Sequence, residues 1–183
     1  MKNIALFSLI LVGFGSLEAQ QYMTRNGTIE FLSATPVENI QAVNKQVSSV
    51  LDFDKDQFAF LVPVKSFSFE KALMQEHFNE NYMYSDKFPN ATFAGKVKDW
   101  EGSELSEGMS VEVIVEGDLT IKGVKKQVSE TGTLEMKEGK IQAKTLFPVN
   151  LSDYEVKIPK TVIDNIAETV DVTVDVALEK YQK

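Results

Sequence analysis

Apolar and polar residues alternate with a period of two along three stretches of the chain, at residues 57–62, 110–116 and 171–179. In the first stretch Phe58, Phe60 and Val62 would share one face. Because successive side chains of a strand point to opposite faces, this alternation predicts strands with one buried and one exposed face.

Weaker alternation, bounded by turn-forming pairs such as Lys122-Gly123 and Glu138-Gly139, predicts more strands. These are Gly27–Ser33, Val47–Phe53, Ala91–Val97, Asp118–Ile121, Gln127–Met136 and Lys140–Phe147. Two segments favour short helices instead. Glu70–Phe78 is rich in helix formers and follows Ser68, a candidate N-cap, and Pro159–Ile166 has proline in its first turn.

Many antiparallel strands with short links predict an all-β fold, either a barrel or a sandwich. A closed barrel of about eight strands is wide enough to hold one small ligand. A sandwich with a similar number of strands fills its interior with its own side chains. The periodicity does not decide between these two architectures.

The first residues have the pattern of a secretory signal peptide, with the basic Lys2 followed by the apolar run Ile4–Phe14. Cleavage is expected after Ala19, with Ser16 as an alternative, which leaves one domain over residues 20–183. The run is far shorter than the roughly 20 apolar residues that span a bilayer, so stable membrane insertion is not expected. The predicted location is the periplasm or the cell exterior.

The amino-acid composition of the chain argues against several classes of function. The formal net charge is −8, which argues against partners that need basic patches, namely nucleic acid and anionic membrane surfaces. The chain contains no cysteine, so its fold depends on a hydrophobic core without disulfides or thiolate metal sites. The oligomeric state is left open by these observations.

Three segments carry a resemblance to a known family: "FSFEKALMQEHFNENYMYSDKFPNATF", "GDLTIKGVKKQV", and "FPVNLSDYEVKIPK" followed by "IAETVDVTVDVAL". Together they resemble the YceI-like family of secreted, lipocalin-like barrels associated with polyisoprenoid and other long-chain lipid binding. The resemblance implies an antiparallel lipocalin-like β-barrel with one or two short helices. Arginines common in the family near the helix and the closing strands are missing here. Since phosphate groups favour arginine or lysine donors, this departure argues against a pyrophosphate site.

Phenylalanine dominates the aromatic residues, with twelve Phe against one Trp. These rings either fill a solid core or line a cavity for an apolar chain, and the resemblance favours the cavity. The expected ligand is an isoprenoid, a quinone or a fatty-acyl molecule, and the helix Glu70–Phe78 would lay Leu73, Met74 and Phe78 over one end of the barrel. The expected ligand-contacting residues are Phe31, Phe58, Phe60, Phe67, Phe69, Leu73, Phe78, Phe93, Val113, Leu119 and Phe147.

His77 is the single histidine. As a catalytic base it would need an orienting carboxylate, for which Glu76 and Asp86 are weak candidates, and as a metal ligand it would need further ligands. We therefore expect no catalytic residue, metal site or cofactor, and a binding protein rather than an enzyme. The alternatives are a secreted structural or protein-interaction barrel with a self-filled core and no ligand, and an enzyme that uses His77.

Overall fold

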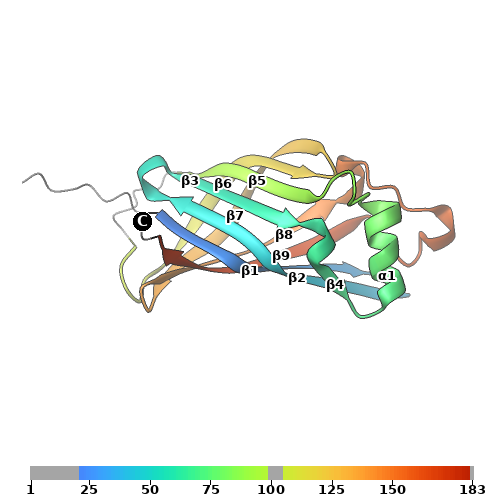
Figure 1. Ribbon diagram of the computed structural model, residues 1–183, viewed down its shortest axis with the longest axis horizontal. Coiled ribbons are helices and arrows are strands. Elements are labelled where there is room, and N and C mark those ends of the chain that lie inside the picture. The colour runs from blue at the N-terminus through green and yellow to red at the C-terminus, as the bar shows by residue number, and fades with distance from the viewer. Residues whose placement is uncertain (1–20, 99–104, 182–183) are drawn as a thin grey trace, which may run out of the picture.

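The computed structural model describes residues 21–98 and 105–181, and these form one continuous antiparallel sheet (Figure 1). The predicted signal peptide, residues 1–19, lies outside the described residues. The strands are β1 (Gln21–Ala34), β2 (Asn39–Asp52), β3 (Gln57–Pro63), β4 (Phe67–Phe69), β5 (Asn90–Lys98), β6 (Ser110–Ile121), β7 (Val124–Lys137), β8 (Lys140–Asn150) and β9 (Thr169–Lys180).

The sheet closes on itself because β1 pairs with β2 along one edge and with β9 along the other. The short β4 pairs with β2 at Ala42–Asn44, beside the segment Ser48–Asp52 that pairs with β3. β3 and β4 therefore share one position in the ring, and eight strands surround the interior. The predicted all-β, antiparallel lipocalin-like barrel is confirmed.

Alternation places the predicted apolar faces inward. On β3, Phe58 and Val62 are buried while Gln57, Ala59 and Leu61 are exposed. Other boundaries differ from the prediction. β6 is one strand where two were expected, and β1 begins at Gln21 because the expected turn at Asn26-Gly27 is a bulge in its pairing with β2. A Cβ at Gly27 would lie 2.5 Å from Val176 Cγ1, so the bulge needs glycine.

Two hairpins have the two-residue turns that the sequence predicts. Lys122 and Gly123 join β6 to β7 with φ angles of 51° and 79°, and Glu138 and Gly139 join β7 to β8 with 53° and 72°. Positive φ at both central residues matches the right-handed twist of the strands. The two turns lie at opposite ends of the barrel, since β7 runs from one end to the other.

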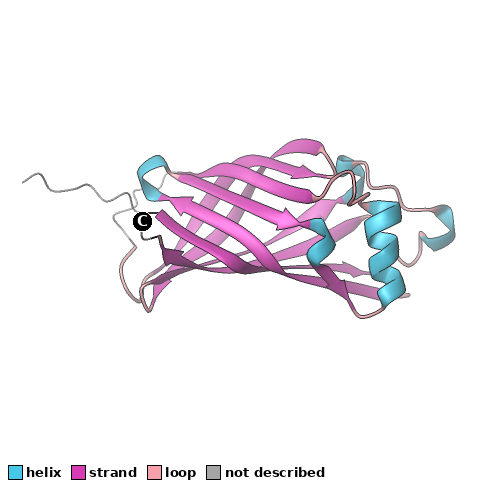
Figure 2. Cartoon of the chain, in the orientation of Figure 1, coloured by secondary structure: helices cyan, strands magenta, loops and turns pink. Residues whose placement is uncertain are grey.

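Helical segments gather mostly at one end of the barrel (Figure 2). The predicted helix over Glu70–Phe78 is shorter than expected: α1 spans Ala72–His77 and continues into a π-helical turn, Phe78–Tyr82. Lys71 is its N-cap, and the predicted cap Ser68 is part of β4. The second predicted helix is a single 3-10 turn, Lys160–Val162. Among residues 21–98 and 105–181, no helix has the length and hydropathy that crossing a bilayer requires.

The end opposite α1 is filled by side chains. Leu51, Leu134, Ile141 and Leu178 are each at most 1% exposed. The ring of Tyr22 packs edge-on against Phe53, with the centroids 5.5 Å apart. Tight aliphatic packing of this kind excludes water and closes the barrel at that end.

Truncating a buried side chain at the filled end should destabilise the fold. We expect Leu178→Ala to lower the free energy of unfolding by about 2–5 kcal/mol, because it opens a cavity among fully buried neighbours. Leu146→Ala is the matched control, since Leu146 is 65% exposed on β8, and we expect a change within about 0.5 kcal/mol. Denaturant unfolding of both variants measures the difference, and equal effects would contradict a packed end.

Candidate functional site

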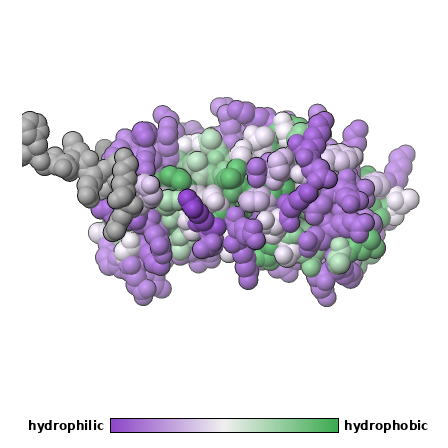
Figure 3. Space-filling model, viewed as in Figure 1, coloured by the Kyte–Doolittle hydropathy of each residue, from purple (hydrophilic) through white to green (hydrophobic). Residues whose placement is uncertain are grey.

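The half of the barrel nearer α1 contains a cavity of about 450 Å³. The outer surface in view is largely hydrophilic (Figure 3), whereas the cavity is bounded mainly by aliphatic and aromatic side chains. Of the predicted residues, those that line the cavity are Phe31, Phe58, Phe60, Phe67, Phe69, Phe78, Phe93, Val113, Leu119 and Phe147. An interior of this size and composition is typical of sites for small apolar ligands.

Leu73 was wrongly placed at the cavity, because its side chain is 60% exposed and does not line it. The helix α1 turns its other face toward the barrel, and Met74 and Phe78 line the cavity from that face. Met74 and Phe78 are four residues apart, which puts them on one side of a helix, whereas the neighbour of Met74 is rotated away from it.

Two groups of phenylalanine rings shape the interior. Phe31 packs against Phe67, Phe69 and Phe78 with centroid distances of 5.4, 5.8 and 5.6 Å. Because Phe78 follows α1 directly, this group fastens the helical segment to the barrel wall. In the second group, Phe58 lies 4.7 Å from Phe60, and Phe60 lies 6.3 Å from Phe93. These rings come from the two neighbouring strands β3 and β5, so they form a continuous apolar wall.

The α1 segment covers one end of the cavity. The connection between β8 and β9 is a second cover, which the sequence analysis did not identify. Its 3-10 turn Leu151–Tyr154 and the following residues contribute Leu151, Tyr154, Val156, Val162, Asn165 and Ile166 to the cavity lining. Tyr154 is 4% exposed. Burial is the main cause that raises the pKa of its phenol, with smaller contributions from Asp153 and Glu130. The sequence analysis predicted a short helix over Pro159–Ile166 in this connection but did not place it against the cavity, and the apolar positions before it have no helical or strand period.

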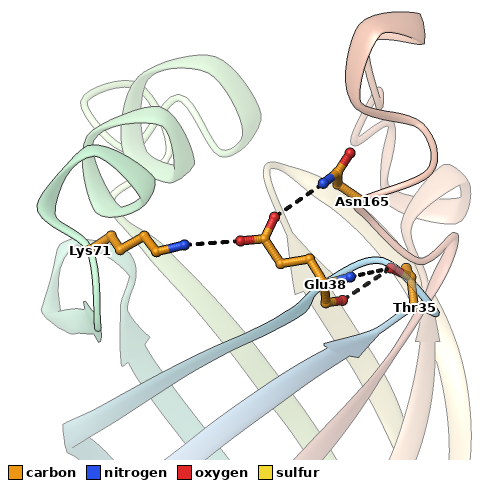
Figure 4. A network of polar contacts seen from close by, with 4 residues as sticks. All are labelled: Thr35, Glu38, Lys71 and Asn165. Carbon is orange, nitrogen blue, oxygen red and sulfur yellow. Dashed lines mark hydrogen bonds and ion pairs between the residues drawn. The ribbon is translucent and has the colours of Figure 1, made fainter.

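The covers are joined by a polar network at Glu38, in the turn between β1 and β2 (Figure 4). Its carboxylate accepts a hydrogen bond from Lys71 Nζ at 3.1 Å, next to α1, and another from Asn165 Nδ2 at 3.2 Å. The Glu38 backbone N–H donates to Thr35 Oγ1 at 3.1 Å, which fixes the turn. The hydrogen bond from Lys71, together with that from Asn165, lowers the pKa of Glu38.

The other titratable side chains on the boundary, apart from tyrosines, are His77, Lys144 and Glu130. His77 is exposed on α1, and among the described residues no hydrogen bond or ion pair joins it to a carboxylate. Asp86, considered above as its partner, pairs with Lys65. Lys144 pairs with Asp175 at 3.2 Å. Among the described residues, no group of three His, Cys, Asp or Glu side chains is arranged to hold a metal ion.

Glu130 was not identified from the sequence, although a signal was present. It lies on β7 between Val128 and Gly132 at the parity of the inward positions, and Leu134 on that face is buried. Its cross-strand partner is Val115, which also lines the cavity. Extending the alternation of β7 back from Leu134 would have placed this carboxylate inside the barrel.

The fold and the cavity define a closed antiparallel β-barrel with an apolar interior that is covered at one end. The YceI-like domain family matches residues 21–178, and the chain belongs to this family. Among curated proteins, none matches the sequence.

Solved structures share the fold at low sequence identity. A polyisoprenoid-binding domain from Saccharophagus degradans superposes with a TM-score of 0.79 at 13% identity, covering 90% of this chain and 100% of its own. Burkholderia cenocepacia BcnA gives 0.66 at 15% identity, covering 84% of this chain and 96% of its own. The Campylobacter jejuni YCEI protein gives 0.61 at 15% identity, with 100% of both chains covered.

The network at Glu38 should hold the two covers in place. Glu38→Gln removes the charge that pairs with Lys71, so we expect modestly faster amide hydrogen exchange in α1 and around Asn165 at neutral pH. Because the pKa of Glu38 is lowered in the fold, its contacts persist at neutral pH and are lost as the pH falls through that lowered value.

The difference between the wild type and Glu38→Gln should therefore begin to shrink below the ordinary glutamate pKa of about 4.3 and vanish once the pH is below the lowered pKa of Glu38. Glu112→Gln is the control, because Glu112 is exposed on β6. Unchanged exchange in Glu38→Gln at neutral pH would show that the network does not restrain the covers.

Proposed function

We propose that this protein binds one long-chain apolar ligand, of isoprenoid, quinone or fatty-acyl type, by burying its hydrocarbon chain in the barrel cavity. The observation that carries the proposal is the apolar interior of about 450 Å³. Each methylene transferred from water to such an interior contributes about 0.8 kcal/mol, so a long chain gains affinity without specific polar contacts. A barrel filled by its own side chains would lack this space.

The fold neighbours support the ligand class. The Saccharophagus degradans domain with the same fold is described as polyisoprenoid-binding, and the phenylalanine-rich interior of the present chain suits a ligand of that kind. We propose a binding role rather than catalysis. From the pattern of the first nineteen residues, we also propose that the protein works in the periplasm or outside the cell.

The direct test is to identify what the purified protein carries. We expect native mass spectrometry of freshly purified protein to show an added mass, and organic extraction to release a long-chain lipid that accounts for it. Extracted protein should then take up a hydrophobic fluorescent dye. Protein that carries no lipid and takes up neither dye nor lipid would favour a barrel without a ligand.

A larger side chain that fills the cavity should compete with the ligand for the same space. Ala91 lines the cavity on β5, so Ala91→Phe should place a ring in the space and weaken dye or lipid binding about tenfold or more, equivalent to about 1.4 kcal/mol. The fold should tolerate the change, because the ring enters an existing void.

Ala59→Phe is the matched control, since Ala59 is exposed on the adjacent strand β3 and should leave binding unchanged. Titration of the dye into each variant measures the affinities, and thermal unfolding verifies that both are folded. Equal affinity in the two variants would mean that the ligand does not occupy this cavity.

A further inference from the structure

The barrel wall splits between β7 and β8. Their ladder runs from Lys137 opposite Lys140 to Gly132 opposite Thr145 and stops there, although both strands continue toward the covered end. By contrast, β7 pairs with β6 up to the turn at Ile121 and Val124, and β8 pairs with β9 as far as Asn150.

The cavity reaches the outer surface at this split. Leu134 and Ala143 are a buried cross-strand pair, so the next pair, Thr133 and Lys144, points outward, and both residues are exposed. Thr133 and Lys144 nevertheless belong to the cavity boundary. The cavity boundary therefore extends to residues of the outer face beside the end of the ladder.

Glu130 lies beside this split. It is half-buried and faces inward next to Val115, two residues from Gly132, where the β7–β8 ladder ends. Among the described residues it has no hydrogen bond or ion pair, and burial raises the pKa of its carboxyl group. Tyr154 from the covering turn is close enough for the charge of Glu130 to act on its phenol.

Two other charged residues on the cavity boundary already have partners. Glu38 is bound to Lys71 and Asn165, and Lys144 is bound to Asp175. A half-buried acceptor without a partner loses hydrogen bonds to water that a donor on the ligand can replace. A negatively charged head group at the same place would be repelled.

We propose that Glu130, with Tyr154 beside it, forms a head-group subsite that selects uncharged, hydroxyl-bearing lipids, with the hydroxyl donating to the carboxylate at the β7–β8 split and the tail in the cavity. This inference rests on the proposed function and deepens it. It adds which end of the ligand faces the split and which head-group chemistry is preferred.

The test compares three probes with one tail on delipidated full-length protein: farnesol, its methyl ether and farnesyl phosphate. We expect farnesol to bind about tenfold tighter than the ether, because only the alcohol can donate to the carboxylate, and the phosphate to bind most weakly. Displacement of a fluorescent dye gives the three affinities. This comparison uses the wild type and does not depend on a variant folding.

Two variants test whether Glu130 causes the preference for the alcohol. Glu130→Leu should remove the preference for farnesol over the ether, and Glu130→Gln, which keeps the size but not the charge, should strengthen binding of the phosphate. Glu112→Leu is the control, because Glu112 lies on the outer face of β6 opposite Thr133 and should leave all three affinities unchanged.

The outcomes separate this inference from the proposed function. Equal binding of alcohol and ether, tightest binding of the phosphate, or a preference that survives in Glu130→Leu would overturn the head-group subsite while leaving a lipid-binding cavity intact. Binding of none of the three probes would overturn both.

Discussion

The double pairing of β1, with β2 along one edge and β9 along the other, closes the sheet into a barrel. Closure at eight strands also sets the width of the interior, at about the size where side chains either just fill a barrel or leave room for one small ligand. This chain does both. Large aliphatic residues such as Leu51 and Leu178 fill one end, and phenylalanine rings at the other end remain along the wall.

The covered end depends on a few attachments between segments that are distant in sequence. Stacked rings around Phe31 hold the segment after α1, and the carboxylate of Glu38 holds both α1 and the β8–β9 connection. The ring contacts bury apolar surface, whereas the Glu38 contacts are only partly buried and depend on charge. The covers are thus attached more strongly on the inner side than at the rim.

Alternation made most of the barrel predictable, since period-two patterns in strands such as β3 and β9 gave the inward faces directly. The parity of Phe58 and Phe60 placed them in the cavity lining without any knowledge of the strand order. The predictions failed in segments whose apolar residues do not alternate with a period of two. Leu73 was misplaced because α1 is only six residues long and its orientation is set by Phe78 packing against Phe31.

The β8–β9 connection escaped prediction for a related reason. Its lining residues before the predicted helix, such as Tyr154 and Val156, lie in an irregular segment, and irregular backbone has no repeat for a pattern to detect. Glu130 was a different case, because the alternation was present in the sequence but the sequence analysis did not single out this glutamate.

The filled end has one further consequence for any molecule held inside. Because Leu134, Ile141 and Leu178 fill the barrel opposite α1, the cavity is closed at that end. A hydrocarbon tail could not leave through the filled end. Any exchange of a bound molecule would therefore have to take place in the half of the barrel that contains α1 and the β7–β8 split.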